Sequence, residues 1–184
     1  DLINQAHVRK FFGENKPDYV FICAGKVGGI MANNTQKGDF IYKNMMIQFN
    51  ILQSAYENGS GKVLAVGSSC IYPRFCQQPI KEEALLTGEL EPTNEPYALS
   101  KIAALKMCEA YREQYDCNFI SAMPTNLYGL NDNYTGFSSH VIPALIKKIH
   151  EAKEKNLSFA VIWGTGTVRR EFLYVDDAAE ALVF

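Results

Sequence analysis

Four short apolar runs, separated by segments with helical spacing of apolar residues, constrain the fold of this chain most strongly. The runs lie at residues 19–23, 62–66, 118–123 and 159–163. Each is nearly continuous in apolar residues, which is typical of a parallel strand buried on both faces of its sheet. Because predicted strands alternate with predicted helices, the sequence predicts an α/β fold with a doubly wound parallel sheet.

The predicted helices lie at residues 3–14, 39–58, 97–115 and 141–149, and a last helix follows the Asp176-Asp177 pair. An Asp of that pair is expected to be the N-cap of the last helix. Residues 74–94 contain Pro, Gly, Glu and Lys with little periodicity, so we interpret them as an irregular excursion. The core-facing positions predicted for the helix at 39–58 are Phe40, Met45, Met46, Phe49, Ile51, Leu52 and Ala55.

Composition and charge exclude several classes of protein. The net charge of −2 over 184 residues provides no basic surface for nucleic acid or an anionic membrane. No apolar run reaches the length that spans a bilayer. Five cysteines without CxxC spacing favour free thiols in a reducing compartment over a disulfide framework or a zinc site. We therefore expect a cytoplasmic protein with no bound metal.

Small and polar residues follow the first three predicted strands. They are Ala24–Gly29, the Gly67-Ser68-Ser69 triplet and Pro124–Gly129. Open α/β sheets bind their ligands at the carboxyl ends of the strands, so these segments are candidates for a ligand-binding edge. For Ala24–Gly29 a plain flexible turn is an equally good interpretation.

Tyr97 and Lys101 stand four residues apart at the start of a predicted helix, so their side chains share one face. A lysine ammonium beside a phenol stabilises the phenolate and lowers a pKa that is otherwise about 10. Tyr and Lys at this spacing also occur on many solvated helix faces. Ser68, at the end of the preceding predicted strand, completes an arrangement for hydride transfer. Ser would polarise a carbonyl, Tyr would supply the proton and Lys would tune Tyr.

Several long motifs, in order along nearly the whole chain, resemble the extended short-chain dehydrogenase/reductase family. The motifs are AGKVGGIMANN, GSSCIYP, EPTNEPYALSK, MPTNLYG, SHVIPALI and WGTGTVRREFLYVDD. They are most similar to the branch that epimerises and reduces GDP-linked 4-keto sugars with NADP(H). The resemblance implies a Rossmann-like fold, and a homodimer formed through helices that include 39–58 and 97–115.

The resemblance also implies a role for each matching position. Tyr97 would be the general acid of the reduction, with Lys101 as its partner and Ser68 on the 4-keto oxygen. Cys70 and His140 would be the epimerisation pair, moving protons at C3 and C5 of the sugar. The positions implied for cofactor binding are Val66, Gly67, Ser68, Ser69, Lys101, Pro124, Thr125, Asn126, Leu127 and His140. Those implied for binding the nucleotide-sugar are Lys148, Trp163 and Arg170, and the cationic groups of Lys148 and Arg170 suit a pyrophosphate.

Simpler interpretations remain for four of these residues. Cys70 could be a buried small apolar residue, and His140 could merely start a helix. Arg170 could form a structural ion pair with an acidic neighbour. Trp163, at the end of a predicted strand, could belong to the core.

We expect residues 1–184 to be the central and catalytic part of an NAD(P)-binding Rossmann-like domain, with residues 131–158 and 164–174 contributing to the substrate side. The Gly-rich fingerprint of the first βα turn does not occur in the sequence. The chain is therefore expected to be a piece that lacks the first βαβ unit and the C-terminal substrate-binding part. Two alternatives stay open, which are an enzyme acting on another nucleotide-diphosphate sugar and a truncated, non-catalytic binding subunit.

Overall fold

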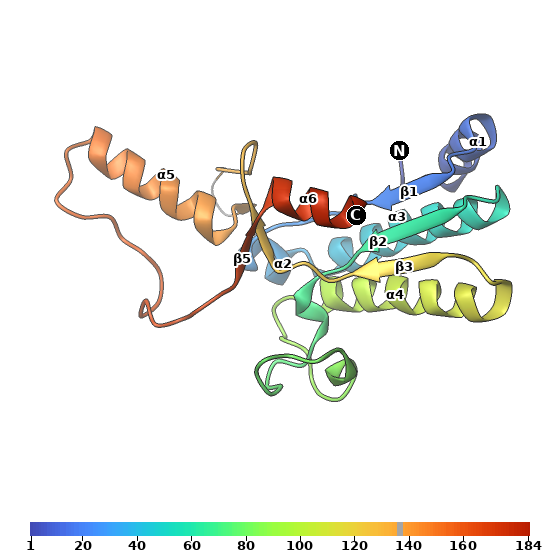
Figure 1. The fold of residues 1–184 in the computed structure, drawn as a ribbon. Helices are drawn as coiled ribbons and strands as arrows, with labels where there is room; N and C mark the ends of the chain where they lie inside the picture. Colours follow the sequence, from blue (N-terminus) through green and yellow to red (C-terminus); the bar gives the residue numbers. More distant parts are fainter. Residues whose placement is uncertain (136–137) are drawn as a thin grey trace. The chain divides into compact units, whose positions relative to one another are not determined.

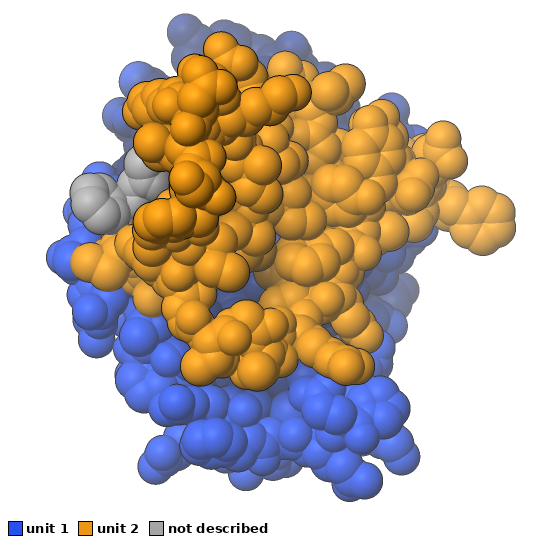
Figure 2. Space-filling model, turned by 90° about the vertical axis from the view of Figure 1, so that its left-hand side faces the viewer, with its two compact units in different colours: residues 1–27, 33–124 blue, residues 28–32, 125–184 orange. Residues whose placement is uncertain are grey.

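A computed structural model describes residues 1–135 and 138–184, which form two compact units (Figure 2). The first unit comprises residues 1–27 and 33–124, and the second comprises residues 28–32 and 125–184. No helix in the described ranges is long and apolar enough to cross a membrane.

The first unit contains a three-stranded parallel sheet in the order β1-β2-β3 (Figure 1). Its strands are β1 (Tyr19–Ile22), β2 (Lys62–Val66) and β3 (Phe119–Ala122). Val63 of β2 is opposite Val20 on one side and Phe119 on the other. All three strands run in the same direction, so their carboxyl ends meet at one edge. The predicted α/β class with a parallel sheet is confirmed.

Helices cover one face of this sheet. The helices of the first unit are α1 (Gln5–Asn15), α3 (Lys37–Glu57) and α4 (Glu95–Tyr115), with short 3-10 turns η1 (Ser69–Ile71) and η2 (Glu82–Ala84). Helices α3 and α4 pack against each other and against the sheet, and α1 packs against α3 (Figure 1). Pro96 lies in the first turn of α4, where its missing N–H costs no helical hydrogen bond. The short helix α2 (Ile30–Thr35), which the sequence analysis missed, includes residues of both units.

The core of the first unit lies between the sheet and these helices. Its buried members are Val8, Phe12, Ile22, Ile47, Ile51, Leu52, Ala55, Val63, Ala65, Ala104, Cys108 and Phe119. Three of the positions predicted to face the core on α3, namely Met45, Met46 and Phe49, are only half-buried. The buried row of α3 instead passes through Asn44 and Gln48, two polar side chains that lie one and two turns after Phe40.

Strand β1 is not buried on both faces, contrary to the prediction. Val20 and Ile22 pack on the core, whereas the alternate residues Tyr19 and Phe21 are 71% and 46% exposed. Because successive side chains of a strand point to opposite faces, helices on one face bury only every second residue.

The second unit contains a pair of parallel strands and two helices. The elements are β4 (Asn126–Tyr128), β5 (Phe172–Tyr174), α5 (Val141–Glu154) and α6 (Val175–Val183). Leu127 is opposite Leu173 in the strand pair. These strands were not predicted, because three residues are too few to show a period of two. The predicted Asp N-cap of α6 is wrong, because the N-cap is Tyr174. The Asp176-Asp177 pair lies in the first turn, where carboxylates interact favourably with the helix dipole.

The strand predicted at residues 159–163 does not form. The structure assigns no strand to this run, and Phe159, Val161, Ile162 and Trp163 are exposed. An apolar run becomes a strand only where a neighbouring strand accepts and donates its backbone hydrogen bonds.

Two neighbouring phenylalanines of α1 provide a test of the core. Phe12 is 4% exposed and packs in the core, whereas Phe11 is 55% exposed. We expect Phe12→Ala to lower the free energy of unfolding by about 3–5 kcal/mol, because it leaves a cavity. Phe11→Ala is the matched control, and urea denaturation measures both. Equal losses in the two variants would contradict this packing of α1.

Candidate active site

Ser68, Cys70 and Tyr97 come together at the carboxyl end of β2. Ser68 is the N-cap of η1, and its hydroxyl accepts a hydrogen bond from the backbone N–H of Cys70 at 3.4 Å. The same hydroxyl interacts with the Cys70 thiol and with the Tyr97 phenol. The turn after β2 therefore presents a hydroxyl and a thiol to the first turn of α4.

Lys101 joins α4 to the end of β2. The side chain is 6% exposed, and its Nζ donates a hydrogen bond to the carbonyl oxygen of Val66 at 2.8 Å. The same Nζ lies 5.8 Å from the centre of the Tyr97 ring, so the predicted pair does share one helix face. Burial lowers the pKa of Lys101, and the neighbouring Cys70 and Cys23 partly oppose this shift.

The predicted lowering of the Tyr97 pKa is wrong for this structure. Burial raises the pKa of Tyr97 well above its usual value, the nearby Cys70 raises it further, and the Ser68 hydroxyl opposes the shift. The physical reason is that burial disfavours the charged phenolate. Tyr97 therefore keeps its proton at neutral pH and is suited to donate it.

Opposing influences set the pKa of the Cys70 thiol. Burial raises the pKa, whereas the Ser68 hydroxyl and the Lys101 charge lower it, and the net shift is upward. Cys70 is half-buried, and its neighbours are a hydroxyl, a phenol and an ammonium. These surroundings are more polar than those of a small apolar core residue.

Asn44 of α3 fixes the segment that follows β1. Its Oδ1 accepts a hydrogen bond from the backbone N–H of Lys26 at 2.7 Å, and its Nδ2 donates to the Lys26 carbonyl at 3.0 Å. A Cβ added to Gly25 would lie 3.0 Å from Asn44 Oδ1 and 4.0 Å from Lys101 Nζ. At Gly25 and Lys26 the segment is therefore not a plain flexible turn, and it lies beside Lys101. Asn44 was not predicted as a site residue, although a polar residue one turn after Phe40 on an apolar helix face is a usable signal.

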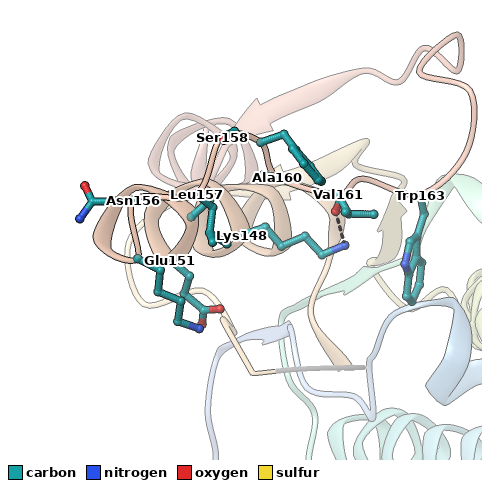
Figure 3. A pocket seen from close by; sticks show the side chains of 11 residues that line it. Lys148, Glu151, Asn156, Leu157, Ser158, Ala160, Val161 and Trp163 are labelled. Carbon is teal, nitrogen blue, oxygen red and sulfur yellow. Dashed lines mark hydrogen bonds between the residues drawn. The ribbon is translucent and has the colours of Figure 1, made fainter.

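In the second unit, Lys148 and Trp163 contact each other in a pocket of about 590 Å³. Lys148 Nζ donates a hydrogen bond to the Val161 carbonyl at 3.1 Å and lies 5.0 Å from the centre of the Trp163 ring. Figure 3 shows Lys148 extending from α5 toward Val161 and Trp163, with Glu151 also lining the pocket. Trp163 is 71% exposed, so it is not a core residue.

Three other predicted positions in this unit make local contacts. Thr125 Oγ1 and Asn126 Nδ2 donate hydrogen bonds to the Glu171 carbonyl at 2.8 and 3.0 Å. Arg170 is exposed, and its Nη1 donates to the Arg169 carbonyl at 2.8 Å. No ion pair of Arg170 occurs within the described part of the chain.

His140 occupies the N-cap position of α5, and its side chain makes no capping hydrogen bond. The structure thus divides the predicted site residues between the two units. The first unit holds Val66, Gly67, Ser68, Ser69, Cys70, Tyr97, Lys101 and Pro124, and the second holds Thr125, Asn126, Leu127, His140, Lys148, Trp163 and Arg170. Among the residues that the structure describes, no group of three His, Cys, Asp or Glu side chains could hold a metal ion.

The charge of Lys101 is testable through the Cys70 thiol. Removing this charge in Lys101→Met leaves burial to raise the pKa of Cys70, so site-resolved alkylation of Cys70 should shift to higher pH. Lys106→Met is the matched control, because Lys106 is exposed on the same helix and pairs with Glu109 at 2.7 Å. An alkylation profile that is the same in Lys101→Met and the wild type would contradict the described geometry.

Comparisons with known proteins extend over the whole chain. Residues 1–184 match the NAD dependent epimerase/dehydratase family. The chain is 56% identical over 184 residues to a GDP-L-fucose synthase of Sinorhizobium fredii and 52% identical over 183 residues to one of Escherichia coli. These alignments cover 100% of this chain but 59% and 57% of the relatives, so the chain spans less than two thirds of their length.

A solved structure shows the same fold. CJ1428, a GDP-D-glycero-L-gluco-heptose synthase from Campylobacter jejuni determined in the presence of NADPH, aligns with a TM-score of 0.90 at 37% identity. That alignment covers 100% of this chain and 62% of CJ1428. The resemblance drawn from the motifs is confirmed: because the family match includes every residue, the chain belongs to the NAD dependent epimerase/dehydratase family.

Proposed function

We propose that the protein carrying this chain is a GDP-L-fucose synthase, an NADPH-dependent enzyme that converts GDP-4-keto-6-deoxy-D-mannose to GDP-L-fucose. The observation that carries the proposal is the cluster of Ser68, Cys70, Tyr97 and Lys101 at the carboxyl end of β2. This cluster combines groups that polarise a carbonyl with groups that transfer protons. The names of the relatives at 56% and 52% identity support the choice of substrate.

In the reduction, Ser68 and Tyr97 act on the 4-keto oxygen. The Ser68 hydroxyl polarises the carbonyl, and Tyr97 delivers its proton to the developing alkoxide. The raised pKa of Tyr97 supports this role, because the phenol is protonated at neutral pH. Lys101 holds α4 at the end of β2, and its ammonium lies 5.8 Å from the centre of the Tyr97 ring.

In the epimerisations, Cys70 and His140 remove and return protons at C3 and C5. Protons next to a ketone become acidic when donors such as Ser68 and Tyr97 stabilise the enolate oxygen. A thiol and an imidazole are both groups that can transfer a proton to or from a substrate.

The donor set at the end of β2 fits NADP(H), which would supply the hydride for C4. A lysine ammonium has three N–H donors, and the structure gives Lys101 a hydrogen bond to the Val66 carbonyl, which leaves donors for ribose hydroxyls. The residues proposed to hold the cofactor are Val66, Gly67, Ser68, Ser69, Lys101, Pro124, Thr125, Asn126, Leu127 and His140. The presence of NADPH with CJ1428 supports this cofactor.

Lys148, Trp163 and Arg170 are proposed to bind the nucleotide-sugar. The Lys148 ammonium and the exposed Trp163 ring share one pocket, which offers a cation for a pyrophosphate and a flat surface for a base. We also propose a homodimer and a cytoplasmic location, the latter supported by five free cysteines. Light scattering of the purified protein tests the dimer.

A different nucleotide-diphosphate sugar is the second candidate. CJ1428, named for a GDP-linked heptose, has the same fold at 37% identity, which favours keeping this candidate. A truncated, non-catalytic binding subunit is the third candidate. The cluster around Tyr97 argues against it, because a scaffold has no need of this combination of groups.

Turnover tests the proposal directly. We expect the protein carrying this chain to oxidise NADPH when given GDP-4-keto-6-deoxy-D-mannose, as followed by absorbance. Tyr97→Phe should lower kcat by about 10²–10⁴-fold, the range of general acid catalysis. No turnover by a folded protein that binds NADPH would favour another nucleotide-sugar, and no NADPH binding would favour the non-catalytic subunit.

Cys70→Ser separates the two half-reactions. We expect this variant to lose epimerisation, measured as solvent deuterium incorporated into the sugar, because the serine hydroxyl is far less acidic than the thiol. Reduction of a sugar that is already epimerised should remain, since Tyr97 and Ser68 are unchanged. If Cys70→Ser and His140→Ala both turn over at the wild-type rate, the assignment of the epimerisation pair is wrong.

A further inference from the structure

Gln48 is a buried glutamine in the interface between α3 and α4. The side chain is 1% exposed, and its helix face is otherwise built largely from apolar residues. Within the described residues, Oε1 of Gln48 is buried and has no hydrogen-bond partner. An unsatisfied buried acceptor is unfavourable for folding. Stability alone therefore does not explain why this buried position holds a glutamine and not an apolar residue.

The donor end of the same amide reaches the second helix. Nε2 donates to the Asn44 carbonyl one turn earlier on α3 at 3.2 Å, and to the Ser100 carbonyl of α4 at 3.4 Å. Both acceptors adjoin the cluster. Ser100 immediately precedes Lys101, and its hydroxyl donates to the Tyr97 carbonyl at 2.6 Å. The side chain of Asn44 accepts a hydrogen bond from the backbone of Lys26, and the preceding Gly25 lies beside Lys101.

We propose that Gln48 is a positioning residue, which sets α4 against α3 so that Tyr97 and Lys101 face the end of β2. An apolar interface tolerates small sliding and rotation of its helices, because dispersion contacts have little directionality. The hydrogen bond from Gln48 to the Ser100 carbonyl is directional, so it favours one position of α4 relative to α3. Gln48 itself touches no substrate, and its effect passes through the backbone at Ser100.

The catalytic part of this inference rests on the proposed function, so its test includes a measurement that needs no turnover. Gln48→Met keeps the shape of the side chain but removes both polar atoms. Asn50→Leu is the matched control, because Asn50 is a buried amide of the same helix whose Nδ2 donates to the Leu2 and Ile3 carbonyls rather than to α4. The measurements are urea denaturation, kcat and KM for the GDP-sugar, and the pH profile of Cys70 alkylation.

We expect Gln48→Met to unfold at the same or a higher urea concentration, because it removes an unsatisfied acceptor. Its kcat should fall by about ten- to a hundredfold, the cost of misplacing a catalytic group, with KM changed much less. Alkylation of Cys70 should move to higher pH, because Lys101 would lie farther from the thiol. The other groups acting on Cys70, the Ser68 hydroxyl and the Tyr97 phenol, are unchanged chemically.

The two proposals fail in different ways. If the wild type does not turn over the GDP-sugar, the proposed function fails, and the Cys70 profile alone supports or overturns the role of Gln48. An unchanged kcat or an unchanged Cys70 profile in Gln48→Met overturns the positioning role. If Gln48→Met and a second variant, Gln48→Leu, both lose their fold, the role is structural and the proposal is overturned.

Discussion

The hydrogen bond from the Lys101 ammonium to the Val66 carbonyl is the interaction on which the candidate site depends. It joins the first turns of α4 to the last residue of β2, and it brings a charged group into a buried place. Burying an ammonium without a hydrogen-bond partner is unfavourable, so the Lys101 ammonium must lie within hydrogen-bonding distance of an acceptor. The turn after β2 and the start of α4 are thereby held together.

Burial at this junction determines the chemistry of the cluster. The same desolvation that raises the pKa values of Tyr97 and Cys70 lowers that of Lys101. Each group is thus shifted toward its neutral form. Neighbouring charges partly oppose this shift for Cys70 and Lys101, whereas for Tyr97 the nearby Cys70 adds to it and only the Ser68 hydroxyl opposes it. A buried phenol that keeps its proton can act as a general acid. The reduction of a ketone to an alcohol requires such a proton donor.

Polar residues on the buried face of α3 are the least expected feature of the fold. Asn44 makes a hydrogen bond with each of its amide atoms, whereas Gln48 leaves its oxygen unpaired. Both lie on the buried row of α3. Asn44 contacts Gly25, which lies beside Lys101, and Gln48 donates a hydrogen bond to the carbonyl of Ser100, which precedes Lys101. Proteins retain buried polar groups in some cases because these groups specify one arrangement of an otherwise apolar interface. The interface here combines apolar packing for stability with amides that select its register.

The sequence alone determined the α/β class, the three strands of the first sheet and the approximate bounds of α1, α3, α4 and α5. These features are local, since periodicity and apolar runs report them directly. The four-residue spacing also placed Tyr97 and Lys101 on one face. The sequence wrongly predicted a strand at residues 159–163 and did not predict the short strands β4 and β5. A strand forms only where a partner strand supplies backbone hydrogen bonds, and a local pattern does not report that partner.

Only the tertiary structure decided the environment of each group. The sequence predicted that Lys101 would lower the pKa of Tyr97, but burial and the neighbouring Cys70 raise it instead. It also left Trp163 open between the core and a site for the nucleotide-sugar. The structure excludes the core, because Trp163 is exposed and lines a pocket. Desolvation, hydrogen-bond competition and exposure depend on segments far apart in the chain, and for that reason no local pattern encodes them.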